Sequence, residues 1–159
     1  MCQSTWNGDN KMITIICIGK LKEEYLIKMC NDYKKRINKY HKLEIVELKD
    51  SNILEEENLV LKHIKKYDYK IVLDIKGKEL DTMSFKEKIE NQFKNGKSTI
   101  CLIIGGSEGL SNNVKKEANE IISFSKFTFP HGLFRGILLE QIYRIMKIMN
   151  NEKYHKWKQ

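Results

Sequence analysis

Three glycines, Gly105, Gly106 and Gly109, lie within five residues, directly after an apolar run at residues 98–104. Glycine adopts positive φ and lets a ligand approach the backbone closely, so this spacing is typical of a binding loop after a strand. No Gly-Lys-Ser/Thr follows, which excludes a phosphate loop, and the spacing differs from the dinucleotide fingerprint. The segment predicts a ligand site that uses no phosphate-binding lysine, with a plain tight turn as the alternative.

A second segment, residues 123–131, is dense in aromatic and hydroxyl side chains. Aromatic rings can stack on a purine, and hydroxyl groups can bond to its edges. His131 is either a general base or a loop histidine without a chemical role. Arg135, Glu140 and Arg144 follow in a basic region, and the two arginines need not share a helix face.

Tyr154, His155 and Lys156 form a third group near the end of the chain. An aromatic ring, an imidazole and an ammonium group together can stack on a base and hold a phosphate. Chain ends are often disordered, so the residue types alone leave both interpretations open.

The elements that position these groups follow from apolar spacing, which alternates between strand and helix periods. Strand-like runs occupy residues 12–18, 43–48, 71–75, 98–104 and 121–124. Helix-like runs occupy residues 23–40, 53–64, 84–93, 111–118 and 133–149. This order predicts a single α/β domain with a mostly parallel sheet, helices on both faces and residues 98–104 at its centre. Ligands of such sheets bind at the carboxyl ends of the strands.

Local signals set some of the boundaries. We expect Gly77 to end the third strand, Ser84 and Glu87 to form a capping box, and Ser111 to cap the fourth helix. Residues 1–11 are polar and unpatterned, so we expect them to be an extension outside a domain that spans residues 12–159.

Composition narrows the function further. The chain has 159 residues and a formal net charge of +8, half of it in residues 131–159, which favours an anionic partner such as nucleic acid. Neither a membrane-spanning run nor a secretory signal is recognisable. The four cysteines show no paired spacing, so we expect reduced thiols in a cytoplasmic protein and no zinc site.

Five segments, in this order, resemble the RlmH family of ribosomal RNA large subunit methyltransferases in the SPOUT superfamily. They are MITIICIGKLKE at 12–23, LDIKG at 73–77, IIGGSEGL at 103–110, FSKFTFPH at 124–131 and YHK at 154–156. Each motif alone is weak, whereas five in the same order and spacing are specific.

The resemblance implies a homodimer that uses S-adenosylmethionine, without a metal, to methylate N3 of a pseudouridine in 23S ribosomal RNA on the assembled ribosome. It also implies a deep trefoil knot in the C-terminal part of the chain. The cofactor-binding residues that it implies are Leu73, Gly105, Phe124, Ser125, Lys126, Phe127, Thr128 and Phe129.

For catalysis, the motif match and the basic tail suggest a division of roles. We expect Tyr154 and His155 to position the base and help remove its N3 proton, and Arg135 and Lys156 to hold flanking phosphates. His131 and Glu140 take supporting roles.

Three alternatives stay open. A SPOUT methyltransferase that acts on transfer RNA would keep the cofactor site and change the substrate. A non-catalytic α/β module that binds RNA or ribosomes would keep the glycine loop only as structure. A flavodoxin-like nucleotide protein is disfavoured because no phosphate loop follows the first strand.

Overall fold

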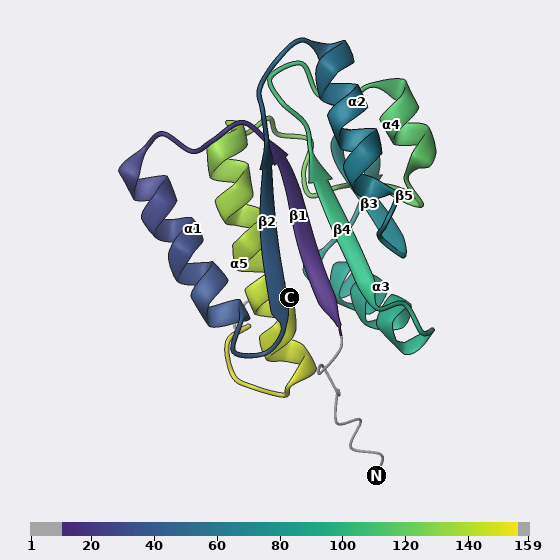
Figure 1. Cartoon of the computed structure of the whole chain (residues 1–159). Coiled ribbons are helices and arrows are strands. Elements are labelled where there is room, and N and C mark those ends of the chain that lie inside the picture. Colours follow the sequence, from purple (N-terminus) through teal and green to yellow (C-terminus); the bar gives the residue numbers. More distant parts are fainter. Residues whose placement is uncertain (1–10, 156–159) are drawn as a thin grey trace.

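The computed structural model describes residues 11–155, in which strands and helices alternate along the chain (Figure 1). The strands are β1 (Met12–Ile18), β2 (Lys42–Leu48), β3 (Tyr69–Glu79), β4 (Thr99–Ile104) and β5 (Glu120–Ser123). The helices are α1 (Glu24–Ile37), α2 (Ile53–Ile64), α3 (Thr82–Lys94), α4 (Asn112–Glu117) and α5 (His131–Met149).

The five strands form one sheet in the order β2-β1-β4-β3-β5, and every pairing is parallel. The predicted α/β class and the central place of β4 are therefore confirmed. Because the strands are parallel, the loops after β3, β4 and β5 leave the same edge of the sheet, where ligands of such folds bind.

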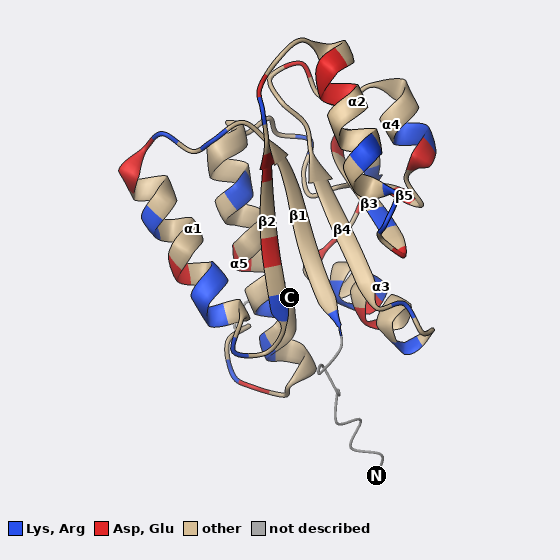
Figure 2. Ribbon diagram, viewed as in Figure 1, with Lys and Arg blue, Asp and Glu red and all other residues tan. Residues whose placement is uncertain are grey.

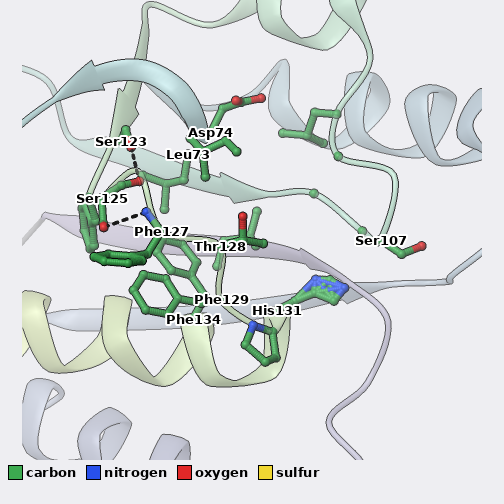
Figure 3. Close-up of a pocket in the computed structure, with 18 of the residues that line it drawn as sticks. Leu73, Asp74, Ser107, Ser123, Ser125, Phe127, Thr128, Phe129, His131 and Phe134 are labelled. Atoms are coloured by element: carbon green, nitrogen blue, oxygen red, sulfur yellow. Dashed lines mark hydrogen bonds between the residues drawn. The ribbon is translucent and has the colours of Figure 1, made fainter.

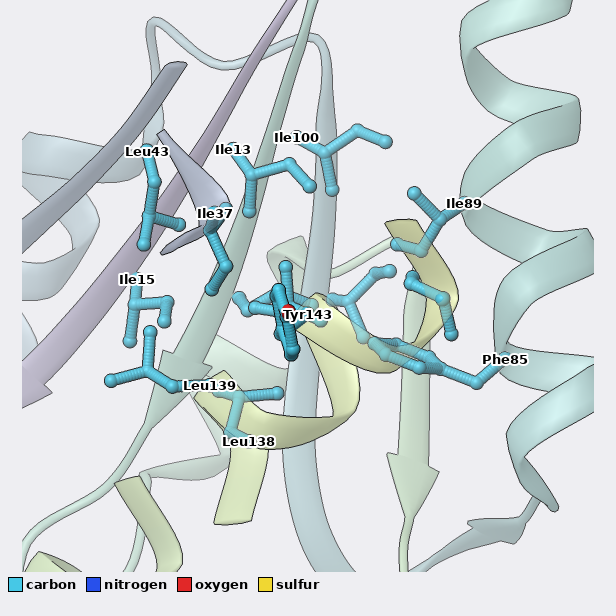
Figure 4. Close-up of a cluster of buried hydrophobic side chains, with 14 of the residues drawn as sticks. Ile13, Ile15, Ile37, Leu43, Phe85, Ile89, Ile100, Leu138, Leu139 and Tyr143 are labelled. Carbon is cyan, nitrogen blue, oxygen red and sulfur yellow. The ribbon is translucent and has the colours of Figure 1, made fainter. Parts of the chain in front are cut away.

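Helices cover both faces of the sheet, and each face has its own core. Helices α1, α3 and α5 pack on one face, around residues such as Ile15, Phe85 and Leu138 (Figure 4). Helices α2 and α4 cover the other face, where Val60 and Val114 are fully buried. Buried apolar side chains on both faces explain the continuous apolar runs of the inner strands.

Two of the predicted boundaries are wrong. Strand β3 does not end at Gly77 but continues to Glu79, with a register shift against β5 between Leu73 and Lys78. A Cβ on Gly77 would lie 2.7 Å from a backbone carbon of Ile122, so the glycine lets β5 approach rather than ending the strand. Helix α3 is capped by Asp81.

The carboxylate of Asp81 accepts from the backbone N–H of Ser84 at 2.8 Å, so Ser84 lies inside the first turn and the predicted capping box is absent. The predicted cap of α4 is confirmed, because Ser111 Oγ accepts from Val114 N at 3.3 Å. Lys11, which we expected to lie outside the domain, donates its Nζ to the Phe93 carbonyl at 2.7 Å. Residues 1–10 lie outside the described part of the chain.

Cys17, Cys30 and Cys101 are free, buried thiols. Burial raises the pKa of Cys17 and of Cys101 to about 12, and the nearby Arg135 offsets only part of this effect at Cys17. None of the helices in residues 11–155 has both the length and the apolar character of a membrane span. The trefoil knot stays a prediction.

Candidate active site

A cavity of about 400 Å³ opens at the edge of the sheet where β4 and β5 end, beside the register shift of β3 (Figure 3). Three chain segments meet around it: residues 73–75 in the middle of β3, the glycine loop after β4 and the loop between β5 and α5. Its lining residues are Leu73, Asp74, Ile75, Ile104, Gly105, Gly106, Ser107, Gly109, Leu110, Ile122, Ser123, Phe124, Ser125, Phe127, Thr128, Phe129, Pro130, His131 and Phe134. The two segments that the sequence singled out therefore share one cavity.

The glycine loop turns tightly against itself. Gly109 N donates to the Gly106 carbonyl at 2.9 Å, and Gly109 has a φ of +76°. A Cβ on Gly105 would lie 2.7 Å from the carbonyl carbon of Gly109, so a larger residue would force the two ends of the loop apart. The loop consequently presents backbone, not side chains, to this part of the cavity.

Aromatic rings form the opposite wall. Phe134 of α5 lies 5.5 Å from Phe124 and 6.4 Å from Phe129 between ring centroids, the second pair being nearly parallel. Phe85 of α3 supports Phe124 edge-on at 5.2 Å. Phe127 is 78% exposed beside this wall, so it is available to a ligand or a partner. The wall gives a flat apolar surface suited to a nucleobase.

Two serines fix the loop after β5. Ser123 Oγ donates to the Ser125 carbonyl at 2.8 Å, and Ser125 Oγ accepts from Phe127 N at 3.0 Å (Figure 3). These bonds hold the loop in one shape, which leaves Thr128 and the backbone of the loop facing the cavity.

Asp74 is a cavity residue that sequence reasoning missed. Its carboxylate forms an ion pair with Lys115 of α4 at 2.8 Å and accepts from Lys76 N at 2.8 Å. Burial alone would raise the pKa of Asp74, but the bonds from Lys115 and Lys76 outweigh it and lower the pKa. The LDIKG motif contained the signal, because Asp74 directly follows a buried strand residue.

Seven of the eight implied cofactor residues line the cavity: Leu73, Gly105, Phe124, Ser125, Phe127, Thr128 and Phe129. Lys126 is the exception, since its side chain is exposed and does not line the cavity.

The expected catalytic residues do not all lie in the cavity. His131 lies in the cavity, at the first residue of α5. Glu140 lies nine residues further along the same helix, a rise of about 13 Å, and belongs to a polar cluster with Arg144, Tyr154 and His155.

In this cluster the carboxylate of Glu140 is the central acceptor. Arg144 donates to its Oε1 through Nε at 2.9 Å and through Nη2 at 2.5 Å, and the Tyr154 hydroxyl donates to the same oxygen at 3.3 Å. The Arg144 guanidinium also lies over the Tyr154 ring, 4.8 Å from its centroid, and its Nη1 is 3.1 Å from His155 Nδ1. Arg144 thus joins all three partners.

Burial raises the pKa of Tyr154 to about 12, and the neighbouring Tyr33 and Glu140 add to the effect. The phenol therefore stays protonated at neutral pH and acts as a hydrogen-bond donor. Tyr154 also packs edge-on against Tyr143 at 4.9 Å, which anchors the end of the described chain to α5.

The expected phosphate-binding role of Arg135 does not fit its position. Arg135 is 6% exposed; its Nη1 pairs with Glu47 Oε2 at 2.7 Å and its Nη2 donates to the Gly19 carbonyl at 3.1 Å. The guanidinium therefore ties α5 to the ends of β1 and β2 and faces the protein interior. Lys156, the other expected phosphate ligand, lies outside the described residues.

Comparison with known proteins identifies the class to which this fold and site belong. Residues 12–155 match a family model described as "Predicted SPOUT methyltransferase". The chain belongs to the SPOUT methyltransferase family, whose members take their methyl group from S-adenosylmethionine.

The similar curated proteins are more specific. A Clostridium botulinum (strain Hall) protein named ribosomal RNA large subunit methyltransferase H is 48% identical over 157 residues, covering 91% of this chain and 99% of the relative. The protein of the same name from the Langeland strain is 47% identical with the same coverage. The predicted family is confirmed by these similarities.

Solved structures support the fold alone, since their sequence identities are low. A methylase family protein from Neisseria gonorrhoeae aligns with a TM-score of 0.59 at 11% identity, covering 100% of this chain and 92% of that one. The tRNA (m1G37) methyltransferase from Aquifex aeolicus aligns with a TM-score of 0.55 at 17% identity, covering 94% and 77%.

Proposed function

We propose that this protein transfers the methyl group of S-adenosylmethionine to N3 of a pseudouridine in 23S ribosomal RNA, on the assembled ribosome in the cytoplasm. The observation that carries the proposal is the cavity at the ends of β4 and β5 and the middle of β3, where the glycine loop faces an aromatic wall. The names of the relatives supply the ribosomal substrate.

The residues of the cavity fit the cofactor. Its adenine needs apolar walls and backbone hydrogen bonds, which the Phe124–Phe134 wall and the loop at Gly105 offer, and it carries no phosphate that would need a lysine. When bound, the cofactor supplies an electrophilic methyl group on a sulfonium. Alignment of donor and acceptor, and exclusion of water, are then the main tasks of the protein.

The pseudouridine imide must lose its N3 proton to become a nucleophile. The cluster of Glu140, Arg144, Tyr154 and His155 provides a carboxylate, a cation and two ring groups that can hold the base and stabilise its anion. His131, which lines the cavity itself, is a further group within reach of a bound ligand.

We further propose that the enzyme is a homodimer. Within one chain, Glu140 lies about 13 Å along α5 from His131, and none of the four residues of the polar cluster lines the cavity. A twofold-related partner would bring a second cluster close to each cavity, and such dimers are the commonest oligomers.

The decisive test is transfer of a labelled methyl group from S-adenosylmethionine to ribosomes that lack the modification, beside free 23S RNA and transfer RNA. We expect label on ribosomes alone. Label on transfer RNA would overturn the substrate, and RNA binding without any transfer would favour the non-catalytic module.

Two variants separate the cofactor site from the catalytic cluster. Gly105→Val should abolish cofactor binding, because its Cβ alone would lie 2.7 Å from Gly109. His155→Ala should reduce turnover and leave cofactor affinity nearly intact. Unchanged cofactor affinity in the first variant would refute the placement of the adenosyl group, and full activity in the second would refute a catalytic role for His155.

A further inference from the structure

Charge is distributed very unevenly along this chain. Residues 20–42 hold eight basic and three acidic side chains, a net charge of +5, and residues 131–159 hold six and two, a net charge of +4. All other residues together hold fifteen basic and sixteen acidic side chains, a net charge of −1. The net positive charge of the protein therefore comes from two segments that are far apart in the sequence.

The fold brings these two segments together. The first contains α1 and the second contains α5, and the two helices pack side by side on the same face of the sheet (Figure 1). Their approach is close: a Cβ on Gly136 of α5 would lie 2.8 Å from the sulfur of Met29 of α1. Among the described residues, 20–42 carry a net charge of +5 and 131–155 a net charge of +2, and both segments lie on this side of the sheet.

The cations of α5 are already neutralised. Arg144 pairs with Glu140 at 2.5 Å, and Lys147 pairs with Glu152 at 2.7 Å. Arg135 is buried against Glu47. These side chains hold the C-terminal segment in place, so they offer little charge to an outside partner.

The outer face of α1 is different. Its inner face buries Leu26, Cys30 and Ile37, whereas Lys28 and Lys35 of α1, and Lys39 in the turn after it, are exposed. Among residues 11–155 these three lysines have no acidic partner within ion-pair distance. Lys28 and Lys35 lie two helical turns apart on α1, about 10 Å, and Lys39 lies two residues beyond the end of the helix. Figure 2 shows the basic segments along α1.

We propose that this lysine stripe, Lys28, Lys35 and Lys39, binds the phosphate backbone of the RNA substrate outside the methyl-transfer site. The inference rests on the proposed function, since it takes the substrate to be RNA. Exposed lysines without acidic partners, two on one helix and a third in the turn after it, suit a polyanion, because each contact with a phosphate releases counterions from the RNA. The stripe supplies affinity without base specificity.

The test compares two triple variants that remove the same charge. Lys28→Gln/Lys35→Gln/Lys39→Gln neutralises the stripe, and Lys62→Gln/Lys65→Gln/Lys66→Gln neutralises three exposed lysines at the end of α2, on the opposite face of the sheet. Glutamine has a helix propensity close to that of lysine, so both proteins should keep the fold. Binding to 23S RNA and to ribosomes is measured across a salt series, together with KM, kcat and cofactor affinity.

For the stripe variant we expect RNA affinity to fall at least tenfold at 0.1 M salt and the slope of log K against log salt to decrease by about 2. KM for ribosomes should rise, with kcat and cofactor affinity unchanged, and the α2 variant should resemble the wild type. Equal losses in both variants, or an unchanged slope, would overturn the proposal.

A loss of ribosome affinity with full affinity for free 23S RNA would also overturn it, because the stripe would then contact an acidic ribosomal protein. Failure of the proposed function gives a different result. Wild-type protein would then transfer no methyl group to any RNA, while the salt series would still show whether the stripe binds phosphate.

Discussion

The guanidinium of Arg144 lies 3.1 Å from Nδ1 of His155. Arginine has only donors and keeps its proton at every accessible pH, so the contact is a hydrogen bond only when Nδ1 is the acceptor. The imidazole proton of neutral His155 must then reside on Nε2. His155 therefore presents an N–H donor to its surroundings, which suits stabilisation of an anionic oxygen on the target base better than removal of its proton.

This relationship predicts the tautomer of His155 directly. In histidine labelled with nitrogen-15, the NMR shifts should show that the neutral imidazole carries its proton on Nε2 and not on Nδ1. Arg144→Met should lose this bias and reduce methyl transfer at least tenfold, because Tyr154 and Glu140 lose the same partner. Lys94→Met, which removes the cation of the exposed Lys94–Glu90 pair on α3, is the control and should retain both the tautomer and most of the activity. A proton on Nδ1 in the wild type would contradict this assignment.

The glycine loop offers a matched pair of substitutions. Gly109 and Gly96 both have positive φ, +76° and +93°, and an added Cβ would meet no atom within 4 Å at either position. Alanine should therefore cost each variant a similar amount of stability, about 1–2 kcal/mol, from backbone strain alone. Of these two glycines, Gly109 lines the cavity and Gly96 does not, so Gly109→Ala should weaken S-adenosylmethionine binding and Gly96→Ala should not.

Calorimetry of cofactor binding and urea unfolding of the two variants check this prediction. Equal cofactor affinity in Gly109→Ala and Gly96→Ala would place the cofactor away from the glycine loop.

The central strand should dominate stability. Leu102 of β4 is fully buried between its neighbours, so Leu102→Ala should lower the free energy of unfolding by about 3 kcal/mol through lost burial and a residual cavity. Leu54 of α2 is 62% exposed, and Leu54→Ala should change stability by less than about 0.5 kcal/mol. Chemical denaturation of both variants gives the comparison; a similar cost at the two positions would contradict the central place of β4.

Most elements of this fold could be predicted from the sequence because their apolar spacing is strong and local. Strand β1 and helix α2 begin and end where the periodicity placed them. Gly77 was misjudged because its role is tertiary: it admits the backbone of β5, which no local pattern reveals. Asp81 and Ser84 are both favourable N-cap residues, and the sequence pattern does not decide between them. In the structure Asp81 is the N-cap of α3.

Some parts of the candidate site could likewise be predicted from the sequence, and others could not. The glycine loop and the loop after β5 are contiguous motifs, so they could be recognised and both line the cavity. The pairs Asp74–Lys115 and Arg135–Glu47 join residues 41 and 88 positions apart, and only the folded chain brings them together. Arg135 therefore looked like a surface cation in the sequence although it is buried in the structure.

A buried histidine should make stability depend on pH. His41 is 3% exposed and packs against Phe93, with ring centroids 5.1 Å apart. Burial, assisted by the charge of Lys11, lowers the pKa of His41 from 6.5 to about 4. Between pH 6.5 and about 4, His41 is therefore protonated in the unfolded chain but neutral in the folded protein. Its full contribution to stability is present above pH 6.5. This contribution is lost as the pH falls towards 4, by about 3 kcal/mol in all.

The substitution His41→Met removes this titration. Urea unfolding between pH 7.5 and 4.5 should therefore show a shallower loss of stability in the variant than in the wild type. Parallel curves would mean that His41 titrates normally in the folded protein.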